Sequence, residues 1–216
     1  KHLAKSDVVH HLAGITSVPR TSKESNENIN NKINQVAIEG TKNLLESVPD
    51  SCKIIFPSTH VVYEGINTSK KEILENEPTI PQLAYATGKV KNEDQIIKSG
   101  KKYIILRLGS VYGYSTDSTR LDIMPNLFSK IASQNGTIKL FSGGKQIKSL
   151  VPLIDVARCF KFMEEKESIK SEIFHVTKDT VTVKEVAQIC KKNNSKVVLR
   201  ETNDEIPNLG YSLSNQ

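Results

Sequence analysis

The stretch Asp7-Val-Val-His-His-Leu-Ala-Gly14 is a short apolar run that ends in small residues. Such a run is typical of a buried parallel strand, and small residues at its end let another group approach the backbone closely. Ligands bind at the carboxyl ends of the strands in open α/β sheets. The stretch therefore predicts a parallel sheet with a binding site at its edge.

Strands and helices alternate along the rest of the first half of the chain. Apolar strands are predicted at Lys53 to Phe56 and from Tyr103 into the glycine-bearing loop that ends at Gly113. Helical spacing of apolar residues predicts helices over Ile33–Leu45, Tyr85–Ser99 and Asp122–Ser133. This alternation predicts an α/β fold built on a doubly wound parallel sheet.

The regular alternation of strands and helices changes after Gly136, and this change suggests a second region. Short strands are predicted at residues 138–141 and 173–176, an Asp155-capped helix over 156–165, and a capping box at Thr182-Val-Lys-Glu185. We expect residues 1–113 to form the main sheet domain. Residues 114–216 are expected to form mainly a smaller α/β lobe, together with elements that return to the sheet.

Composition excludes several classes of protein. The 216 residues are 37% hydrophobic and 25% charged, with no run long enough to span a membrane and no signal-peptide pattern at the start. Three scattered cysteines predict neither a disulfide framework nor a metal site, and favour a reduced, cytoplasmic compartment. The net charge of +6 comes from lysines spread along the chain. We therefore expect no nucleic-acid partner and no membrane partner.

The segment Tyr85-Ala-Thr-Gly-Lys89 places a phenol and an ammonium on one face of a predicted helix. A nearby cation favours the phenolate, so Lys89 would bring Tyr85 into the range where it exchanges protons near neutral pH. Thr59 lies 26 residues upstream, just after the strand at Lys53 to Phe56. The plainer interpretations are a loop-capping threonine and an ordinary amphipathic helix face.

Six segments stand out in order along the chain: His11-Leu-Ala-Gly14, Glu39-Gly-Thr-Lys-Asn-Leu-Leu45, Ser58-Thr59 before Val62-Tyr63, Tyr85-x-x-x-Lys89 with Glu93, Leu106-Arg-Leu-Gly-Ser-Val-Tyr-Gly113, and Leu153-Ile-Asp-Val-Ala157. Taken together, they resemble the NAD-dependent epimerase/dehydratase family, the nucleotide-sugar-modifying branch of the extended short-chain dehydrogenase/reductase superfamily. The resemblance covers nearly the whole chain. It implies a Rossmann-type fold, with an NAD-binding domain over residues 1–113 and a substrate-binding lobe over 114–216.

The resemblance also implies a catalytic triad. Tyr85 would transfer the proton, Lys89 would hold the nicotinamide ribose and lower the tyrosine pKa, and Thr59 would hydrogen-bond the sugar oxygen that is oxidised. An NAD-dependent nucleotide-sugar epimerase acting by transient oxidation is the activity expected. A homodimer is implied as well, because the helices near Ile33–Leu45 and Tyr85–Ser99 pack as a four-helix bundle in this family.

The expected ligand contacts follow from the same resemblance. The cofactor would contact residues at two strand ends and on the helix, namely Leu12, Ala13, Gly14, Ser58, Tyr85 and Lys89. The nucleotide sugar would contact Thr59, Ser110 and Lys148. NAD is the expected cofactor and NADP stays open. His2 and His175 have no partner at ligand spacing, and His10 and His11 are expected to be core or supporting groups, so no metal site is predicted.

The chain departs from the family at its beginning. The glycine-rich turn that cradles the dinucleotide pyrophosphate is missing, since no GxxGxxG occurs in the sequence. By the same resemblance, about sixty residues of the family's architecture are missing before Lys1, and the end is also short. We expect the printed sequence to be a fragment that binds NAD poorly, and its activity in isolation stays open.

Smaller departures concern the substrate. Ser110 replaces a common asparagine, and Lys148 replaces an arginine and so lacks the bidentate fork that grips a phosphate. The dehydratase subgroup has an acidic pair after the threonine, where this chain has His60-Val61, which favours an epimerase. The alternatives are an NAD(P)H-dependent reductase, a dehydratase, and a non-catalytic dinucleotide-binding protein.

Overall fold

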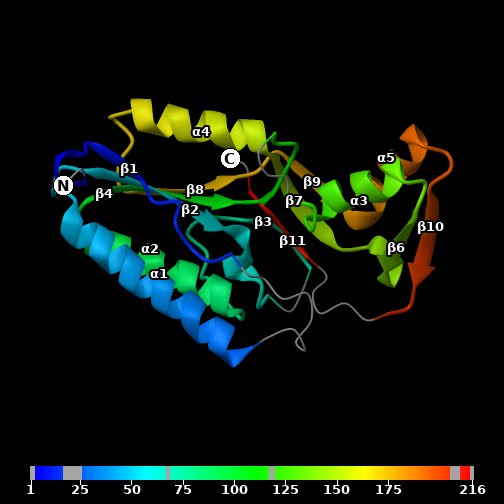
Figure 1. Cartoon of the computed structure of the whole chain (residues 1–216), viewed down its shortest axis with the longest axis horizontal. Coiled ribbons are helices and arrows are strands. Elements are labelled where there is room, and N and C mark those ends of the chain that lie inside the picture. Colours follow the sequence, from blue (N-terminus) through cyan, green and yellow to red (C-terminus); the bar gives the residue numbers. More distant parts are fainter. Residues whose placement is uncertain (1–2, 17–25, 67–68, 117–119, 205–209, 215–216) are drawn as a thin grey trace. The chain divides into compact units, whose positions relative to one another are not determined.

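The computed structural model describes residues 3–16, 26–66, 69–116, 120–204 and 210–214 (Figure 1). By its internal contacts the chain divides into two compact units. Unit 1 comprises residues 1–65, 76–107 and 159–174, and unit 2 comprises residues 66–75, 108–158 and 175–216. The division between residues 113 and 114 that the sequence suggested stays a prediction.

Unit 1 is built on a sheet with the strand order β1-β2-β4-β8. Its strands are β1 (Val8–His10), β2 (Lys53–Thr59), β4 (Lys102–Leu108) and β8 (Glu172–Val176), the last of which continues into unit 2. β1 and β2 run parallel, with Val8 opposite Lys53. Most residues of β2 and β4 are buried, as expected for strands whose two faces are both covered.

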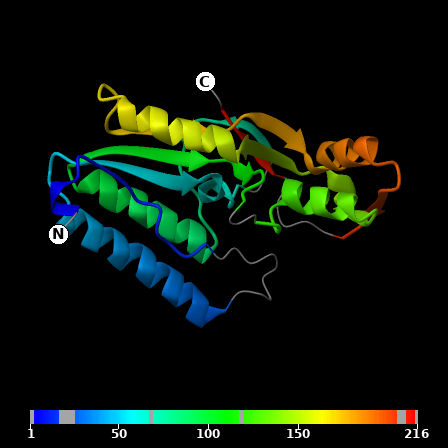
Figure 2. The same ribbon diagram turned by 45° about the horizontal axis from the view of Figure 1, so that its top comes forward.

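Helices cover both faces of this sheet. α1 (Glu27–Ser47) and α2 (Ala84–Lys98) pack together on one face, and α4 (Leu153–Glu165) runs along the other (Figures 1 and 2). The predicted doubly wound α/β fold is therefore confirmed. The core beneath α1 and α2 is an apolar cluster of buried side chains: Val48, Cys52, Ile54, Phe56, Ile96 and Ile105.

Lys53 ties β2 to the end of α4. Its Nζ donates hydrogen bonds to the carbonyl oxygens of Met163, Glu164 and Lys166, at 2.7, 3.0 and 3.1 Å. These are carbonyl groups that a helix end leaves without an intrahelical partner. The buried ammonium satisfies them and so fixes the last turn of α4 to the sheet.

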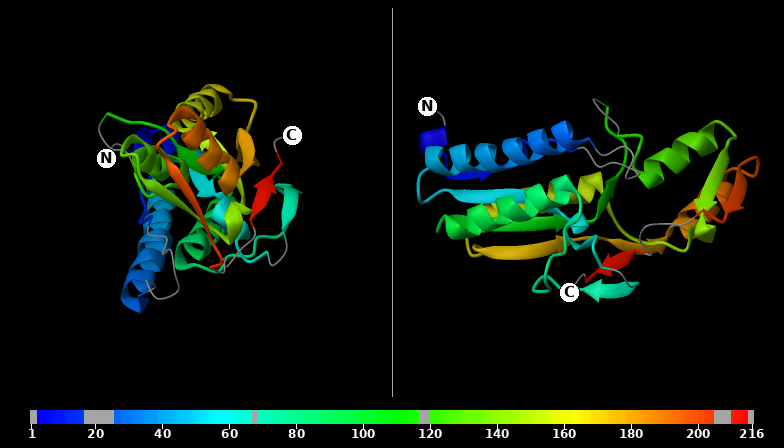
Figure 3. Two further views of the ribbon diagram at one scale, coloured as in Figure 1. Left: turned by 90° about the vertical axis from the view of Figure 1, so that its right-hand side faces the viewer. Right: turned by 90° about the horizontal axis from the view of Figure 1, so that it is seen from below.

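Unit 2 contains α3 (Met124–Ser133), α5 (Val183–Asn193) and several small sheets. β7 (Ile147–Pro152) lies between a parallel partner, β5 (Ser110–Tyr112), and an antiparallel one, β9 (Asp179–Thr182). Two further parallel pairs join β6 (Thr137–Phe141) to β10 (Val198–Thr202) and β3 (Lys70–Ile73) to β11 (Tyr211–Leu213) (Figure 3). A separate core, which includes Phe128, Ile138 and Leu140, lies among them.

Several boundaries differ from those that the sequence suggested. α4 begins at Leu153, so Asp155 lies in its first turn and does not cap it. β1 covers only Val8–His10, because the Leu12 amide already turns back to the His10 carbonyl oxygen at 3.0 Å. The Thr182 capping box is present as predicted, with Glu185 as its partner.

None of the helices within the described ranges is both long enough and apolar enough to cross a bilayer. Within those same ranges, no group of three or more His, Cys, Asp and Glu side chains is placed to hold a metal ion.

Candidate active site

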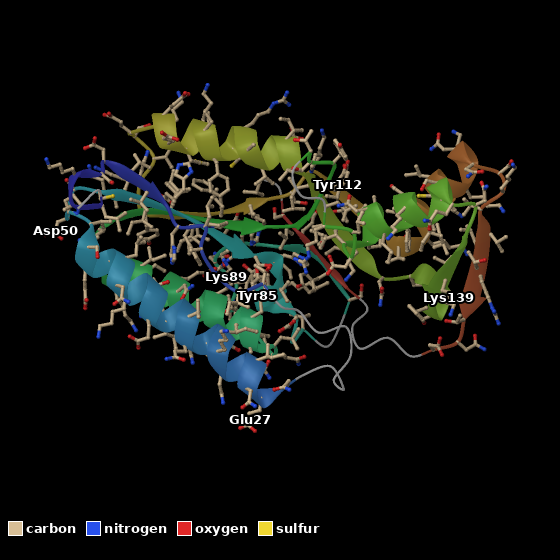
Figure 4. The ribbon with its side chains drawn as sticks, in the orientation of Figure 1. Glu27, Asp50, Tyr85, Lys89, Tyr112 and Lys139 are labelled. Carbon is tan, nitrogen blue, oxygen red and sulfur yellow. The ribbon has the colours of Figure 1, made fainter. Side chains whose placement is uncertain are left out.

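Tyr85 and Lys89 lie one turn apart on α2 (Figure 4). The Lys89 Nζ lies 5.9 Å from the centroid of the Tyr85 ring and 4.4 Å from that of the Phe56 ring. It also donates a 2.6 Å hydrogen bond to the carbonyl oxygen of Pro57. Lys89 thus joins the helix to the carboxyl end of β2.

The environment of Lys89 makes its ammonium group more acidic. Burial lowers the pKa of Lys89 to about 8, and the negative charge of Glu93 opposes this effect. The side chain is therefore a cation at neutral pH and loses its charge in mildly alkaline solution. An ammonium has three donors, of which the Pro57 carbonyl occupies one.

Thr59 is the buried last residue of β2. Its Oγ1 accepts a 3.2 Å hydrogen bond from the Val61 amide and so caps the 3-10 helix η3 (His60–Tyr63). The plain loop-capping role is therefore present. A hydroxyl that accepts one hydrogen bond keeps its own proton to donate, so capping leaves Thr59 able to contact a ligand.

Ser58 belongs to a buried polar network that the sequence reasoning missed. Its hydroxyl donates to Glu93 Oε1, and Arg107 donates to both oxygens of the same carboxylate, at 3.1 and 2.7 Å. Arg107 Nη1 also donates to the Tyr63 hydroxyl at 2.5 Å. Two signals were available: Glu93 follows Lys89 at helical spacing, and Arg107 interrupts an apolar strand.

The expected cofactor residues of β1 lie at an open strand end. Leu12, Ala13 and Gly14 are exposed, and a Cβ atom added at Gly14 would meet nothing within 4 Å. His11, just before them, is buried and its Nε2 lies 2.8 Å from Thr41 Oγ1. Burial and the nearby Lys89 lower the pKa of His11, which keeps the ring neutral.

The expected residues thus fall into two groups. Those named for catalysis and for the cofactor lie in unit 1, at the ends of β1 and β2 and on α2, which packs against β2 and η3. Ser110 and Lys148 lie in unit 2, on the paired strands β5 and β7. Burial lowers the pKa of Lys148.

His10 supports α4. Its Nε2 lies 3.3 Å from Glu164 Oε2, and its ring is tilted against that of Phe160. This contact agrees with the supporting role that the sequence suggested for it.

A sheet with helices on both faces and open strand ends defines a Rossmann-like protein. The family model described as "NAD dependent epimerase/dehydratase family" matches residues 1–177, and the chain belongs to this family. It is accordingly an enzyme of the NAD-dependent epimerase/dehydratase type, and its cofactor is the NAD of this family. The open end of β1 and the spare donors of Lys89 fit a nicotinamide ribose.

Solved structures share the fold. The UDP-glucose 4-epimerase of Thermotoga maritima, with UDP-glucose, is 23% identical with a TM-score of 0.81, over 97% of this chain and 68% of its own. The UDP-glucuronic acid 4-epimerase of Bacillus cereus, with UDP-glucuronic acid and NAD, is 22% identical (TM-score 0.79; 97% and 66%). TunA, an NAD-dependent NDP-hexosamine 5,6-dehydratase, is 20% identical (TM-score 0.75; 95% and 66%). The chain thus spans about two thirds of their length, and no curated protein sequence matches it.

Proposed function

We propose that this chain carries the catalytic part of a nucleotide-sugar epimerase in which Thr59, Tyr85 and Lys89 act together. The observation that carries the proposal is the 2.6 Å hydrogen bond from Lys89 to the Pro57 carbonyl. Through this bond, a half-buried ammonium lies one helical turn from Tyr85 and beside the Ser58-Thr59 strand end. A cation, a phenol and a hydroxyl from two separate segments are the groups that a proton-transfer site requires.

Each residue has a distinct task in this proposal. Tyr85 removes the proton of the sugar hydroxyl, and the charge of Lys89 favours the phenolate that makes this possible. Thr59 donates a hydrogen bond to the same sugar oxygen and orients it. NAD, held at the end of β1 and by Lys89, would supply the hydride chemistry at the sugar carbon. Tyr85 returns the proton to the sugar oxygen when that carbon is reduced from its opposite face, which gives the epimer.

The proposed substrate is a UDP-hexose, bound with the help of Ser110 and Lys148. Support comes from the UDP-sugar epimerases that share the fold. An epimerase is favoured over a dehydratase because His60-Val61 follows Thr59, which leaves that position without an acidic pair to assist elimination.

The test uses the full-length protein with NAD and a UDP-hexose. Proton NMR should show conversion of UDP-glucose to UDP-galactose, or of the matching uronic-acid pair, without net consumption of added NADPH. Stoichiometric consumption of NADPH would support a reductase instead. Loss of water from the sugar would support a dehydratase, and binding of NAD without turnover of any UDP-sugar would support a non-catalytic protein.

We also propose a homodimer that forms through α1 and α2, in a cytoplasmic protein. Ile29 and Val36 are exposed, and their spacing of seven residues places them on one face of α1. Light scattering should give the mass of a dimer, and Val36→Glu should give a monomer. A monomeric wild type would contradict the proposal. The free cysteines Cys52, Cys159 and Cys190 support a reducing compartment.

A further inference from the structure

The ion pair between Glu93 of α2 and Arg107 of β4 is buried, with side chains exposed by only 5% and 6%. The guanidinium grips both carboxylate oxygens, so the pair has a fixed, planar geometry. A buried ion pair of this kind commonly adds no more stability than apolar side chains of the same volume would. The fixed geometry of the pair, and not its contribution to stability, is therefore its distinctive property.

Glu93 and Arg107 form hydrogen bonds with residues on both sides of Thr59 in the sequence. Ser58, immediately before Thr59, donates to Glu93, and Tyr63, at the end of η3, accepts from Arg107. Between these two anchors Thr59 caps η3 through the Val61 amide. The position of the Thr59 hydroxyl thus depends on a turn whose two ends are bonded to one ion pair.

The face of α2 that carries Glu93 also carries Lys89. Lys89 and Glu93 are four residues apart on α2 and bind adjacent residues of β2: Lys89 the Pro57 carbonyl and Glu93 the Ser58 hydroxyl. Two successive turns of the helix are therefore pinned to two successive residues of the strand. This arrangement fixes the rotation of α2, and with it the direction of Tyr85, relative to Thr59.

We propose that Glu93 and Arg107 are positioning residues, which set the Thr59 hydroxyl and the α2 side chains Tyr85 and Lys89 in the relative geometry that proton transfer requires. This inference rests on the proposed function for its effect on turnover. A displacement of about 1 Å in a catalytic group can cost about 100-fold in rate. Loss of the pair should therefore act on kcat far more than on substrate binding.

The sharpest variant is Arg107→Lys in the full-length protein. Lysine keeps the positive charge but lacks the planar fork with which arginine holds both carboxylate oxygens and the Tyr63 hydroxyl in one fixed geometry. We expect kcat to fall roughly tenfold or more, while KM for the UDP-sugar changes by less than about threefold. A wild-type kcat would show that charge neutralisation alone is the role of Arg107, and would overturn the proposal.

Glu93→Gln tests the carboxylate, with Asp94→Asn as the matched control. Asp94 is the next residue on α2, and it is an exposed partner of Lys98. Glu93→Gln should lower kcat and move the alkaline limb of the kcat profile to lower pH, because the charge that opposes deprotonation of Lys89 is gone. Asp94→Asn should change neither property. A wild-type kcat in folded Glu93→Gln would overturn the positioning role of the carboxylate.

Hydrogen exchange gives a readout that does not depend on turnover. The double variant Glu93→Met/Arg107→Met leaves no uncompensated charge, so it should fold even if a single variant does not. The Val61 amide, whose hydrogen bond reports the position of Thr59, should exchange about tenfold faster than in the wild type, while amides of α1 should not change.

Unchanged protection at Val61 would overturn the inference whatever the activity. A wild type that turns over no UDP-sugar, together with faster exchange at Val61, would instead remove the proposed function and keep the structural role of the pair. The two failures are therefore distinguishable.

Discussion

The ammonium of Lys89 donates to the carbonyl oxygen of Pro57, two residues before Thr59, at 2.6 Å. A lysine on a helix is thereby bonded to the backbone of the strand end that it faces. The bond orients the ammonium and leaves it two further donors. The first predictions concern the groups on either side of this bond.

Tyr85→Phe removes the hydroxyl that would transfer the proton and keeps the ring that packs beside Lys89. We expect kcat to fall by about 10²–10⁴-fold, the usual contribution of general acid–base catalysis, with an unchanged circular dichroism spectrum and melting temperature. Tyr114→Phe is the matched control, because Tyr114 is 80% exposed in unit 2. Turnover near the wild-type rate in Tyr85→Phe would remove Tyr85 from the mechanism.

The pH dependence of kcat should report the charge of Lys89. Its pKa is about 8, and the proposed mechanism needs the cation, so kcat should decline as the pH rises through about 8. A profile that stays flat to pH 9.5 or so would show that the charge is not required. Lys89→Met should be slow at every pH and should lack this limb.

The free energy of unfolding should also depend on the charge of Lys89, but it should rise with pH where kcat falls. The pKa of Lys89 falls from 10.5 to about 8 on folding, so between these values the unfolded chain binds more protons. Lys89 therefore adds stability as the pH rises from about 8 to 10.5, by up to about 3 kcal/mol. Urea denaturation at pH 8 and pH 10 should show this rise in the wild type relative to Lys89→Met. Equal changes in both proteins would contradict the prediction.

Two glycines offer a paired test of packing. A Cβ atom at Gly109, between β4 and β5, would lie 2.8 Å from the Ser149 carbonyl oxygen, whereas one at Gly40 in α1 would meet nothing within 4 Å. Gly109→Ala should destabilise the protein by about 1–3 kcal/mol, since overpacking forces the backbone to shift. Gly40→Ala should stabilise it by about 0.5–1 kcal/mol, because alanine loses less entropy in a helix. Thermal melts of both variants check the two signs.

The start of α5 gives a test in unit 2. Thr182 Oγ1 accepts from the Glu185 amide, and Glu185 Oε2 accepts from the Thr182 amide at 2.6 Å. Thr182→Ala should cost about 1 kcal/mol, which corresponds to a melting temperature lower by about 3 °C. Thr180→Ala, at an exposed position two residues upstream, is the control and should change it much less. Equal effects of the two variants would show that the cap contributes little.

Patterns within one segment predicted most of unit 1. The helical spacing of α2 predicted its bounds to within one residue, and the apolar runs located β2 and β4, although β2 continues to Thr59, three residues beyond its predicted end. α1 begins six residues earlier than the apolar spacing suggested, because its first turns are rich in asparagine and carry few apolar residues. The Asn26 side chain that caps it, by bonding the Asn28 amide at 2.9 Å, was an available signal.

Relationships between distant segments could not be predicted in this way. β3, with the sequence Lys-Lys-Glu-Ile, is polar and becomes a strand because β11 pairs with it from the other end of the chain. The Glu93–Arg107 pair joins a helix to a strand, and its partners Ser58 and Tyr63 come from a third segment. Glu93 stood in one of the segments that resemble the family, but only the fold identifies its partners.

The bonds from Lys53 to the end of α4 join groups about 110 residues apart in the chain. A ribosome adds roughly 5–20 residues per second, so a nascent β2 waits on the order of ten seconds before its ammonium finds these carbonyls. During that interval an apolar strand stands without its last covering helix. Until α4 has been synthesised, this strand is therefore a site at which the nascent chain can aggregate.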